Sequence, residues 1–326
     1  MNPICFDLEG PLSPQDNAYD LMKMIPNGDQ IFEVISRYDD LLTLEGREGY
    51  EPGDTLALIV PFLVLHNISE ADIAALARQA TLIDGAAELV AELKGSGWEV
   101  FCITTTYEQY AGHITAKLGI ERDNVACTRF GLDDFKITLC KEDTTLLKDT
   151  EQAILSIKND DDQIKRQLDT FFYKQLPRTQ FGRAISQVEP VGGRRKVTAL
   201  KTFSWRIEKP LDSWVAVGDS ITDFRMLKEV DNAGGLAVAF NANQYALPYA
   251  TMSLASINIG DLASVLKAWQ QGGREAAEDM VATMAQGDDD RRRNFHWLPS
   301  GGDIYDIISL HRRLRRLVRD EAGNLG

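Results

Sequence analysis

The chain has 326 residues, a length that predicts one core domain with added segments rather than a single small domain. It carries 35 basic and 49 acidic residues, a net charge of −14, so neither nucleic acid nor an anionic membrane is an expected partner. Hydrophobic residues make up 44% of the chain, but the longest apolar stretch, around residues 56–65, is far shorter than the roughly 20 residues that cross a bilayer. The N-terminus has no signal-peptide pattern and the four cysteines have no zinc spacing, so we expect a cytoplasmic protein.

The first predicted elements are a strand and a long helical segment. Residues 3–8 are mostly apolar and are followed by Gly10-Pro11, which predicts a buried strand that ends in a sharp turn. The segment from Ser13 to about Ala80 has helical periodicity and contains a capping box at residues 69–72. Beyond it, the pattern predicts a helix over 86–94, a strand over 98–103, a helix over 107–118 and short strand-like pieces over 125–139.

The second half of the chain continues this alternation. Residues 142–175 predict an inserted helical hairpin, and residues 214–217 and 234–240 predict two further strands. From Asp261 onward the pattern is again helical, with a loop over 287–302. Alternating strands and helices predict an α/β fold with a Rossmann-like parallel sheet that helices cover on both faces. Ligands of such sheets bind beyond the carboxyl ends of the strands.

Acidic and hydroxyl side chains follow three of the predicted strands. They are Asp7 and Glu9 after the first, Thr104, Thr105 and Thr106 after the second, and Asp219 and Asp223 after the third. A basic run, residues 192–196, opens a helix ahead of the third strand. We therefore expect a polar site at one edge of the sheet.

The carboxylates of this group predict a metal site. Crowded carboxylates repel one another unless a cation lies between them. Asp7, Asp219 and Asp223 offer the hard oxygen ligands that suit Mg²⁺. With the metal neutralising charge, Asp7 can attack phosphorus and form an aspartyl-phosphate.

The other side chains have candidate roles around that attack. Glu9 lies two residues after Asp7 on the same side of an extended backbone, so it can protonate the leaving oxygen and later activate water. Thr104 can donate a hydrogen bond to a phosphoryl oxygen, and Lys196 can neutralise another. Thr105 and Thr106 are candidates for substrate contact, and equally for turn residues that bond the local backbone.

Four segments resemble the motifs of the haloacid dehalogenase (HAD) superfamily, in the family's order: residues 6–10, Ile103-Thr104, Lys196 and residues 217–223. The resemblance implies the HAD fold, an aspartyl-phosphate mechanism and a magnesium ion bound by Asp7, the main-chain carbonyl of Glu9 and Asp219. Asp223 is then a direct or supporting partner of the metal. The opening run also resembles HAD proteins associated with archaeal energy-converting hydrogenase, a likeness that supplies no substrate.

Two positions depart from the family pattern or leave it open. The family usually has Asp where this chain has Glu9, although the enolase-phosphatases have a similar Asp-x-Glu-Gly run. Glu9 is therefore either a working acid–base group or a residue that contributes only its main-chain carbonyl. The cation of the third motif is Lys196 or its neighbour Arg194.

The resemblance also predicts a domain layout: a HAD core of residues 1–12, 80–141 and 187–262, a helical cap of 13–79, a helical insertion of 142–186 and a C-terminal helical extension of 263–326. In the family, an insertion between the first two motifs is a mobile cap that closes over the site and selects small substrates. In the extension, Ile307, Leu310, Leu314 and Leu317 form an apolar stripe, which predicts that the arginines of residues 312–319 face solvent. These C-terminal helices are candidates for contact with a second copy or a protein partner.

The combined prediction is a magnesium-dependent phosphatase that hydrolyses a small phosphorylated metabolite. One alternative is a HAD-fold accessory protein of a larger enzyme complex with little turnover. Another is a phosphotransferase that uses the same aspartyl-phosphate. The sequence names no substrate, because substrate selection depends on cap residues that follow no general rule.

Overall fold

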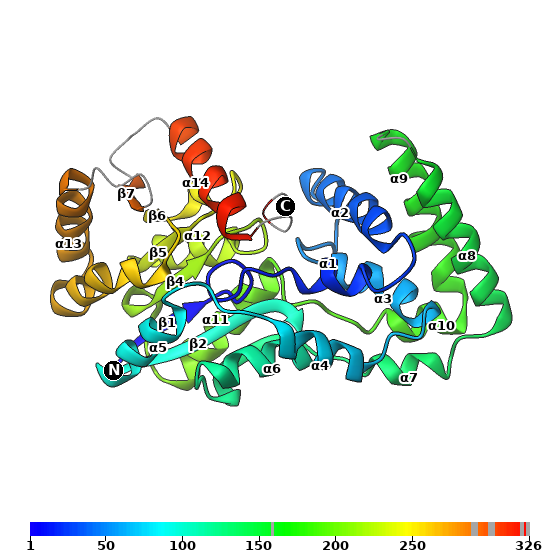
Figure 1. The fold of residues 1–326 in the computed structure, drawn as a ribbon, viewed down its shortest axis with the longest axis horizontal. Helices are drawn as coiled ribbons and strands as arrows, with labels where there is room; N and C mark the ends of the chain where they lie inside the picture. The colour runs from blue at the N-terminus through cyan, green and yellow to red at the C-terminus, as the bar shows by residue number, and fades with distance from the viewer. Residues whose placement is uncertain (158–159, 288–292, 299–303, 320–322, 324–326) are drawn as a thin grey trace.

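A seven-stranded sheet forms the centre of the molecule, with strand order β3-β2-β1-β4-β5-β6-β7 (Figure 1). The computed structural model describes residues 1–157, 160–287, 293–298, 304–319 and 323. The strands are β1 (Asn2–Phe6), β2 (Trp98–Tyr107), β3 (Val125–Thr128), β4 (Val215–Gly218), β5 (Leu236–Phe240), β6 (Met252–Ser256) and β7 (Arg293–Trp297). All pairs are parallel except β6–β7, so the predicted α/β fold with a Rossmann-like sheet is confirmed.

The register of the central strands sets which residues meet at the carboxyl edge of the sheet. Phe6, the last residue of β1, pairs with Cys102 of β2 on one side and with Val217 of β4 on the other. Strand β2 continues to Tyr107 instead of ending at residue 103 as predicted, so Thr104, Thr105 and Thr106 lie within it, beside the residues that follow β1 and β4.

Helices cover both faces of the sheet. They are α5 (Ala86–Gly95), α6 (Glu108–Lys117), α11 (Arg194–Arg206), α12 (Phe224–Ala233) and α13 (Ala263–Gly287). On one face Ile4 and Phe6 share a core with Leu89 and Ile114 of α5 and α6. On the other face Cys5 belongs to a second core with side chains of α11 and α12, because successive strand residues point to opposite sides.

Seven further helices form a helical lobe beside the sheet (Figure 1). They are α1 (Asn17–Met22), α2 (Gly28–Leu44), α3 (Thr55–Leu65), α7 (Leu132–Lys136), α8 (Lys141–Ser156), α9 (Asp161–Thr170) and α10 (Gln180–Ile185). The lobe is built from two separate stretches of chain. Arg47, after α2, joins Asp169 of α9 at 2.6 Å, and Tyr38 donates to the same carboxylate at 2.6 Å. The first helical segment and the later insertion thus pack into one body.

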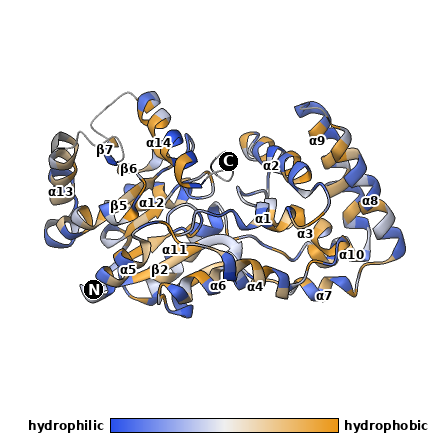
Figure 2. Ribbon diagram, in the orientation of Figure 1, coloured by the Kyte–Doolittle hydropathy of each residue, from blue (hydrophilic) through white to orange (hydrophobic). Residues whose placement is uncertain are grey.

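Helix α4 (Glu70–Gln79) packs on α6 and starts with the capping box that the sequence predicts, between Ser69 and Asp72. Hydrophobic residues line the strands and α3, as Figure 2 shows. Within the described residues, no single helix is long and apolar enough to cross a membrane. Only α3 and α4 taken together reach that length and composition, and a bend of 115° separates them.

The C-terminal part differs from its prediction in three places. Strand β6 was not predicted, and β7 lies within the segment expected to be a loop, residues 287–302, of which 288–292 and 299–302 fall outside the described residues. The backbone of α13 is not helical at Gly272 and Gly273, which kink it. The last helix, α14 (Ile304–Arg319), buries Ile307 and Leu314 as expected, but Leu317 is 65% exposed. The buried face of α14 is therefore rotated from the predicted stripe and includes Arg315 and Arg319.

Candidate active site

Asp7 is the first residue after β1 and lies almost fully buried at the carboxyl edge of the sheet. Its amide donates to the Val217 carbonyl at 2.8 Å, and its Oδ1 accepts from the Leu8 amide at 2.7 Å. The chain then turns back, and Gly10 has a φ of +104°. A Cβ at Gly10 would lie 2.3 Å from Oδ2 of Asp219, so only glycine allows this turn to approach that carboxylate.

Lys196, on the first turn of α11, is the cation that reaches Asp7. Its buried Nζ lies 2.9 Å from Oδ1 of Asp7 and 2.7 Å from Oδ1 of Asp223. Burial by itself lowers the pKa of Lys196, but Asp223 and Asp7 outweigh it, so the pKa is raised and the ammonium stays charged. Arg194 instead pairs with Glu51, at the edge of the helical lobe.

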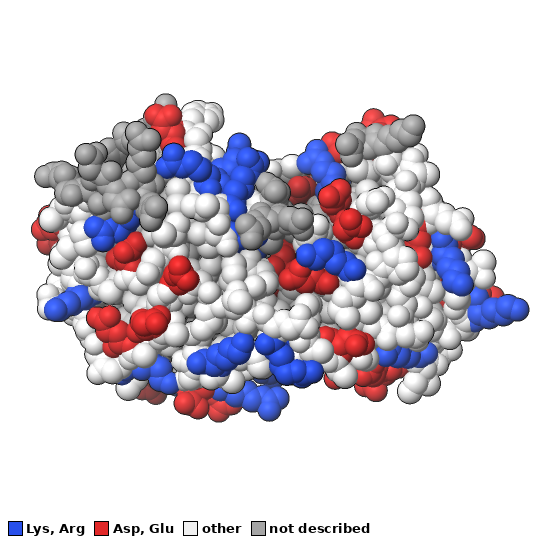
Figure 3. Space-filling view, viewed as in Figure 1, with Lys and Arg blue, Asp and Glu red and all other residues white. Residues whose placement is uncertain are grey.

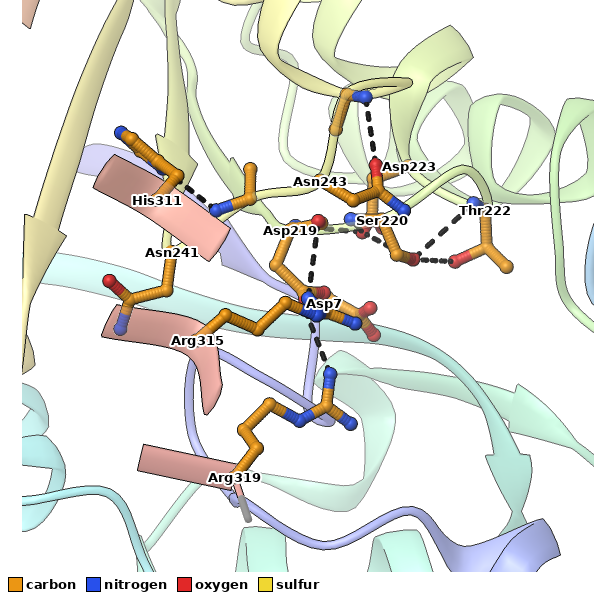
Figure 4. Close-up of polar contacts among 12 residues, drawn as sticks. Asp7, Asp219, Ser220, Thr222, Asp223, Asn241, Asn243, His311, Arg315 and Arg319 are labelled. Carbon is orange, nitrogen blue, oxygen red and sulfur yellow. Dashed lines mark hydrogen bonds and ion pairs between the residues drawn. The ribbon is translucent and has the colours of Figure 1, made fainter. Parts of the chain in front are cut away.

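Asp223 holds this arrangement in place. Its Oδ2 accepts from the amides of Asp219 and Ser220 at 3.0 and 3.1 Å (Figure 4). Its Oδ1 accepts from the Lys196 ammonium at 2.7 Å. Both carboxylate oxygens are thus engaged in fixing the loop after β4 and the lysine.

Asp7, Asp219 and Asp223 could together hold a metal ion. They offer oxygen atoms within 4.8 Å of one another, and Oδ1 of Asp219 is buried with no hydrogen-bond partner among the described residues. Burial and the nearby Asp223 raise the pKa of Asp7 to about 8 despite the opposing effect of Lys196. A cluster of carboxylate oxygens, one of them orphaned, fits a hard divalent cation such as Mg²⁺.

Glu9 faces the same cavity as Asp7, a space of about 110 Å³ between the sheet edge and the helical lobe. Its Oε1 accepts from the Asn17 amide at 2.7 Å, at the start of α1. Burial, and after it the Asp16 carboxylate, raise the pKa of Glu9 well above its usual value. A raised pKa favours the protonated form of Glu9, which is the form that a general acid needs.

The three threonines near the end of β2 are placed differently. Thr105 lines the cavity, and its hydroxyl donates to the Val191 carbonyl at 3.3 Å. Thr104 is fully buried and its Oγ1 accepts from the Thr106 amide at 3.3 Å. The Thr106 hydroxyl is buried without a hydrogen-bond partner among the described residues. Thr105 is thus the one of the three that the cavity exposes, and the substrate roles of Thr104 and Thr106 stay predictions.

Two arginines that the sequence analysis placed in solvent lie in the site. Arg315 and Arg319 extend from α14 to the Asp219 carboxylate, and Arg319 Nη1 lies 3.0 Å from its Oδ2 (Figure 4). Both side chains are about 5% exposed and line the cavity. The i, i+4 spacing of His311, Arg315 and Arg319 marks one helical face and was the available signal. The apolar stripe masked it, because periodicity alone cannot tell which face of a helix meets a site.

Comparison with known proteins gives likeness in structure alone. No protein-family model matches the chain, and no curated protein sequence does. The chain is similar to the structure of gene product AF1437 from Archaeoglobus fulgidus, with a TM-score of 0.88 and 27% identity over 100% of this chain and 99% of that one. It is also similar to a phosphoserine phosphatase in its apo form, with a TM-score of 0.52 and 16% identity over 81% and 98% of the two chains.

A probable phosphoserine phosphatase from Vibrio cholerae gives a TM-score of 0.50 at 18% identity, over 85% of this chain and 67% of that one. These identities show a shared fold and nothing finer, and the narrower likeness to hydrogenase-associated proteins stays a prediction. The chain has the same α/β fold as these phosphoserine phosphatases, and membership of the HAD superfamily, which its four motifs predict, stays a prediction.

Proposed function

We propose that this protein is a magnesium-dependent phosphatase that hydrolyses a small phosphorylated metabolite in the cytoplasm through an aspartyl-phosphate. The observation that carries the proposal is the buried cluster of Asp7, Lys196, Asp219 and Asp223, of which Asp7 and Asp219 line a cavity. A carboxylate held by a buried ammonium, beside an orphaned carboxylate oxygen, is an arrangement suited to phosphoryl transfer. The fold shared with phosphoserine phosphatases supports the same reaction class.

In this proposal the residues of the chain divide the reaction into two steps. Asp7 attacks phosphorus, and Lys196 holds the Asp7 carboxylate in line while it neutralises a phosphoryl oxygen. Glu9 donates its proton to the leaving oxygen, then takes a proton from the water that attacks the aspartyl-phosphate. A magnesium ion bound by Asp7, the Glu9 carbonyl and Asp219 would supply positive charge between the nucleophile and the phosphoryl oxygens.

The helical lobe would act as the cap of this enzyme. It contributes Phe32, Asp39 and Thr55 to the cavity wall, opposite Asp7. A cavity of about 110 Å³ that two lobes enclose admits a small substrate and excludes a folded protein.

The first test is the substitution Asp7→Asn. It removes the nucleophilic oxygen with little change of shape, so magnesium-dependent release of phosphate from p-nitrophenyl phosphate should fall by at least about 1,000-fold. The control is Asp29→Asn, on the exposed side of α2, which should keep full activity. Full activity in Asp7→Asn would contradict the mechanism.

The intermediate gives a second test. A single turnover with ³²P-labelled substrate, quenched in acid, should leave a protein-bound label that hydroxylamine removes, and Asp7→Asn should carry none. Transfer of the phosphoryl group to an added alcohol rather than to water would identify a phosphotransferase instead. No release from any member of a phosphometabolite panel with Mg²⁺ would favour the accessory-protein alternative.

A further inference from the structure

Helix α14 connects the catalytic cavity to a second cavity of about 280 Å³. The two cavities share Asp40 and Arg315 as wall residues. The floor of the second cavity is tied to the metal-ligand loop, since the Asn243 amide donates to the Asp219 carbonyl at 2.8 Å. A ligand that fills the first cavity can therefore extend past Arg315 into the second.

The sign of the wall charge changes between the two cavities. Around the proposed nucleophile the carboxylates outnumber the cations: Asp7, Glu9, Asp16, Asp39, Asp40 and Asp219 face Arg315 and Arg319. Among the described residues that line the second cavity, Arg312, Arg315 and Arg316 face one carboxylate, Asp40. Figure 3 shows basic side chains gathered over α14, across the hollow from acidic side chains of the helical lobe.

Arginines on one helical face can hold an anion. Arg315 is 4% exposed and fixed by Asp219, so its position is set before any ligand arrives. Arg312 and Arg316 are exposed and lie one helical turn apart, and Arg312 is oriented by Gln244, whose Oε1 accepts from its Nη2 at 3.5 Å. Guanidinium groups at this spacing match the bidentate geometry of phosphate and carboxylate.

We propose that the second cavity is an anion subsite, and that the substrate is a phosphomonoester with a second anionic group, either a phosphate or a carboxylate. This inference rests on the proposed function, because the first phosphate is the one that Asp7 attacks. The second group binds Arg312 and Arg316, with Arg315 at the boundary. A substrate without it leaves this subsite unused and binds against the acidic wall of the first cavity.

The test uses three substrates that differ only in the distal group: n-butyl phosphate, the phosphate ester of 4-hydroxybutyrate and butane-1,4-diol bisphosphate. The kcat/KM of the wild-type protein with Mg²⁺ should be at least about tenfold higher for one or both members with a distal anionic group than for n-butyl phosphate. The member that gains identifies the distal group as carboxylate or phosphate. Homologues of that member with three to six carbons then show which distance between the two anionic groups matches the distance between the two sites.

Single substitutions locate the effect. Arg312→Gln and Arg316→Gln should each lower the ratio of kcat/KM between the preferred substrate and n-butyl phosphate by about fivefold or more. The matched control is Arg313→Gln, which removes the same charge from an exposed position of α14 outside both cavities and should leave the ratio unchanged. Equal kcat/KM values for all spans and distal groups, or the same loss in Arg313→Gln, would overturn the inference.

Binding to the Asp7→Asn protein separates this inference from the proposed function. Isothermal titration calorimetry should detect binding of the preferred compound with a distal anionic group to that variant. Adding Arg316→Gln to the same variant should weaken this binding. If such binding occurs but the wild-type protein hydrolyses no phosphomonoester, the proposed function fails and the subsite stands. In the other case, p-nitrophenyl phosphate is hydrolysed, but the compounds with a distal anionic group are neither preferred over n-butyl phosphate nor bound through the arginines. The subsite is then wrong and the proposed function stands.

Discussion

Lys196 is a fully buried ammonium whose only described ion pairs are with Asp7 and Asp223. Lys196→Met keeps most of its volume but leaves the two carboxylates without their cation. Because breaking a buried ion pair exposes an uncompensated charge to a low dielectric, the free energy of unfolding should fall by about 3–5 kcal/mol. Urea unfolding in the absence of divalent metal measures this.

The control for that change lies on the same helix. Lys201 is largely exposed and pairs with Glu229, so Lys201→Met should cost less than about 1 kcal/mol. Equal losses in the two variants would show that the buried cluster contributes no more to stability than a surface pair.

His311 makes stability depend on pH. It is fully buried, and its Nδ1 accepts from the Ala242 amide at 2.9 Å, which requires a neutral ring. Burial, and secondarily His296, lower its pKa to about 3. Since the unfolded chain has the ordinary pKa of about 6.5, it binds the extra proton below that pH and the folded state does not.

The stability that neutral His311 provides is therefore complete above about pH 6.5 and is lost as the pH falls toward 3. Between pH 7 and pH 4.5 the loss should be roughly 2 to 3 kcal/mol. Unfolding curves of wild type and His311→Gln across this range isolate the contribution, and parallel pH profiles would count against it.

At the residue scale, the sequence was sufficient to place a site residue where that residue follows a predicted strand. Asp7, Asp219 and Asp223 could be placed at one edge because parallel strands end together. Lys196 could not be separated from Arg194, since both stand in one basic run and only packing shows which of them is buried.

At the scale of elements, the loop between α2 and α3 anchors the helical lobe to the core. Glu51 accepts from the Arg194 amide at 2.9 Å, and Asp54 pairs with Arg195 on the same first turn of α11. Arg194 thus serves as an anchor for the lobe rather than as a neighbour of Asp7.

Glu51→Gln should loosen this anchor. Hydrogen bonds to charged groups are about twice as strong as neutral ones, so a neutral side chain at position 51 should hold the helical lobe less firmly over the cavity. We therefore expect KM for p-nitrophenyl phosphate to rise, by roughly tenfold or less. Amide hydrogen exchange should also quicken at the start of α11. Glu48→Gln, exposed on the same connection, is the control, and an unchanged exchange rate in Glu51→Gln would refute the anchor.

Elements with a hydrophobic pattern of their own could be predicted from the sequence. A strand that forms only by pairing with a neighbouring strand could not. The strands around β1 and β4 are short apolar runs that are buried on both faces. Strand β7, Arg-Asn-Phe-His-Trp, has no apolar run and exists because it adds antiparallel to the edge of β6. Such an edge depends on the tertiary fold, so local sequence gives little sign of it.

At the scale of the whole molecule, one hydrophobic core runs from the sheet into the helical lobe. The same cluster contains Ile4 of β1, Phe62 of α3 and Leu168 of α9. A continuous core predicts that the two lobes unfold together although the chain is long.

The tryptophans make this testable. All five lie outside the helical lobe, at positions 98, 205, 214, 269 and 297, so their fluorescence reports on the sheet and its helices. Circular dichroism reports on the helices of both parts. The two transitions in urea should coincide, and an earlier loss of helical signal would indicate a lobe that unfolds by itself.

The place of β1 in the sheet also sets an order of events during synthesis. Of the described strands it is synthesised first, yet it lies between β2 and β4, whose paired residues follow about a hundred and two hundred positions later. The hydrogen bond from the Asp7 amide to Val217 therefore forms only after β4 has been synthesised. Arg315 and Arg319 follow all of the described strands, so the cavity beside Asp7 is completed only after the sheet can form.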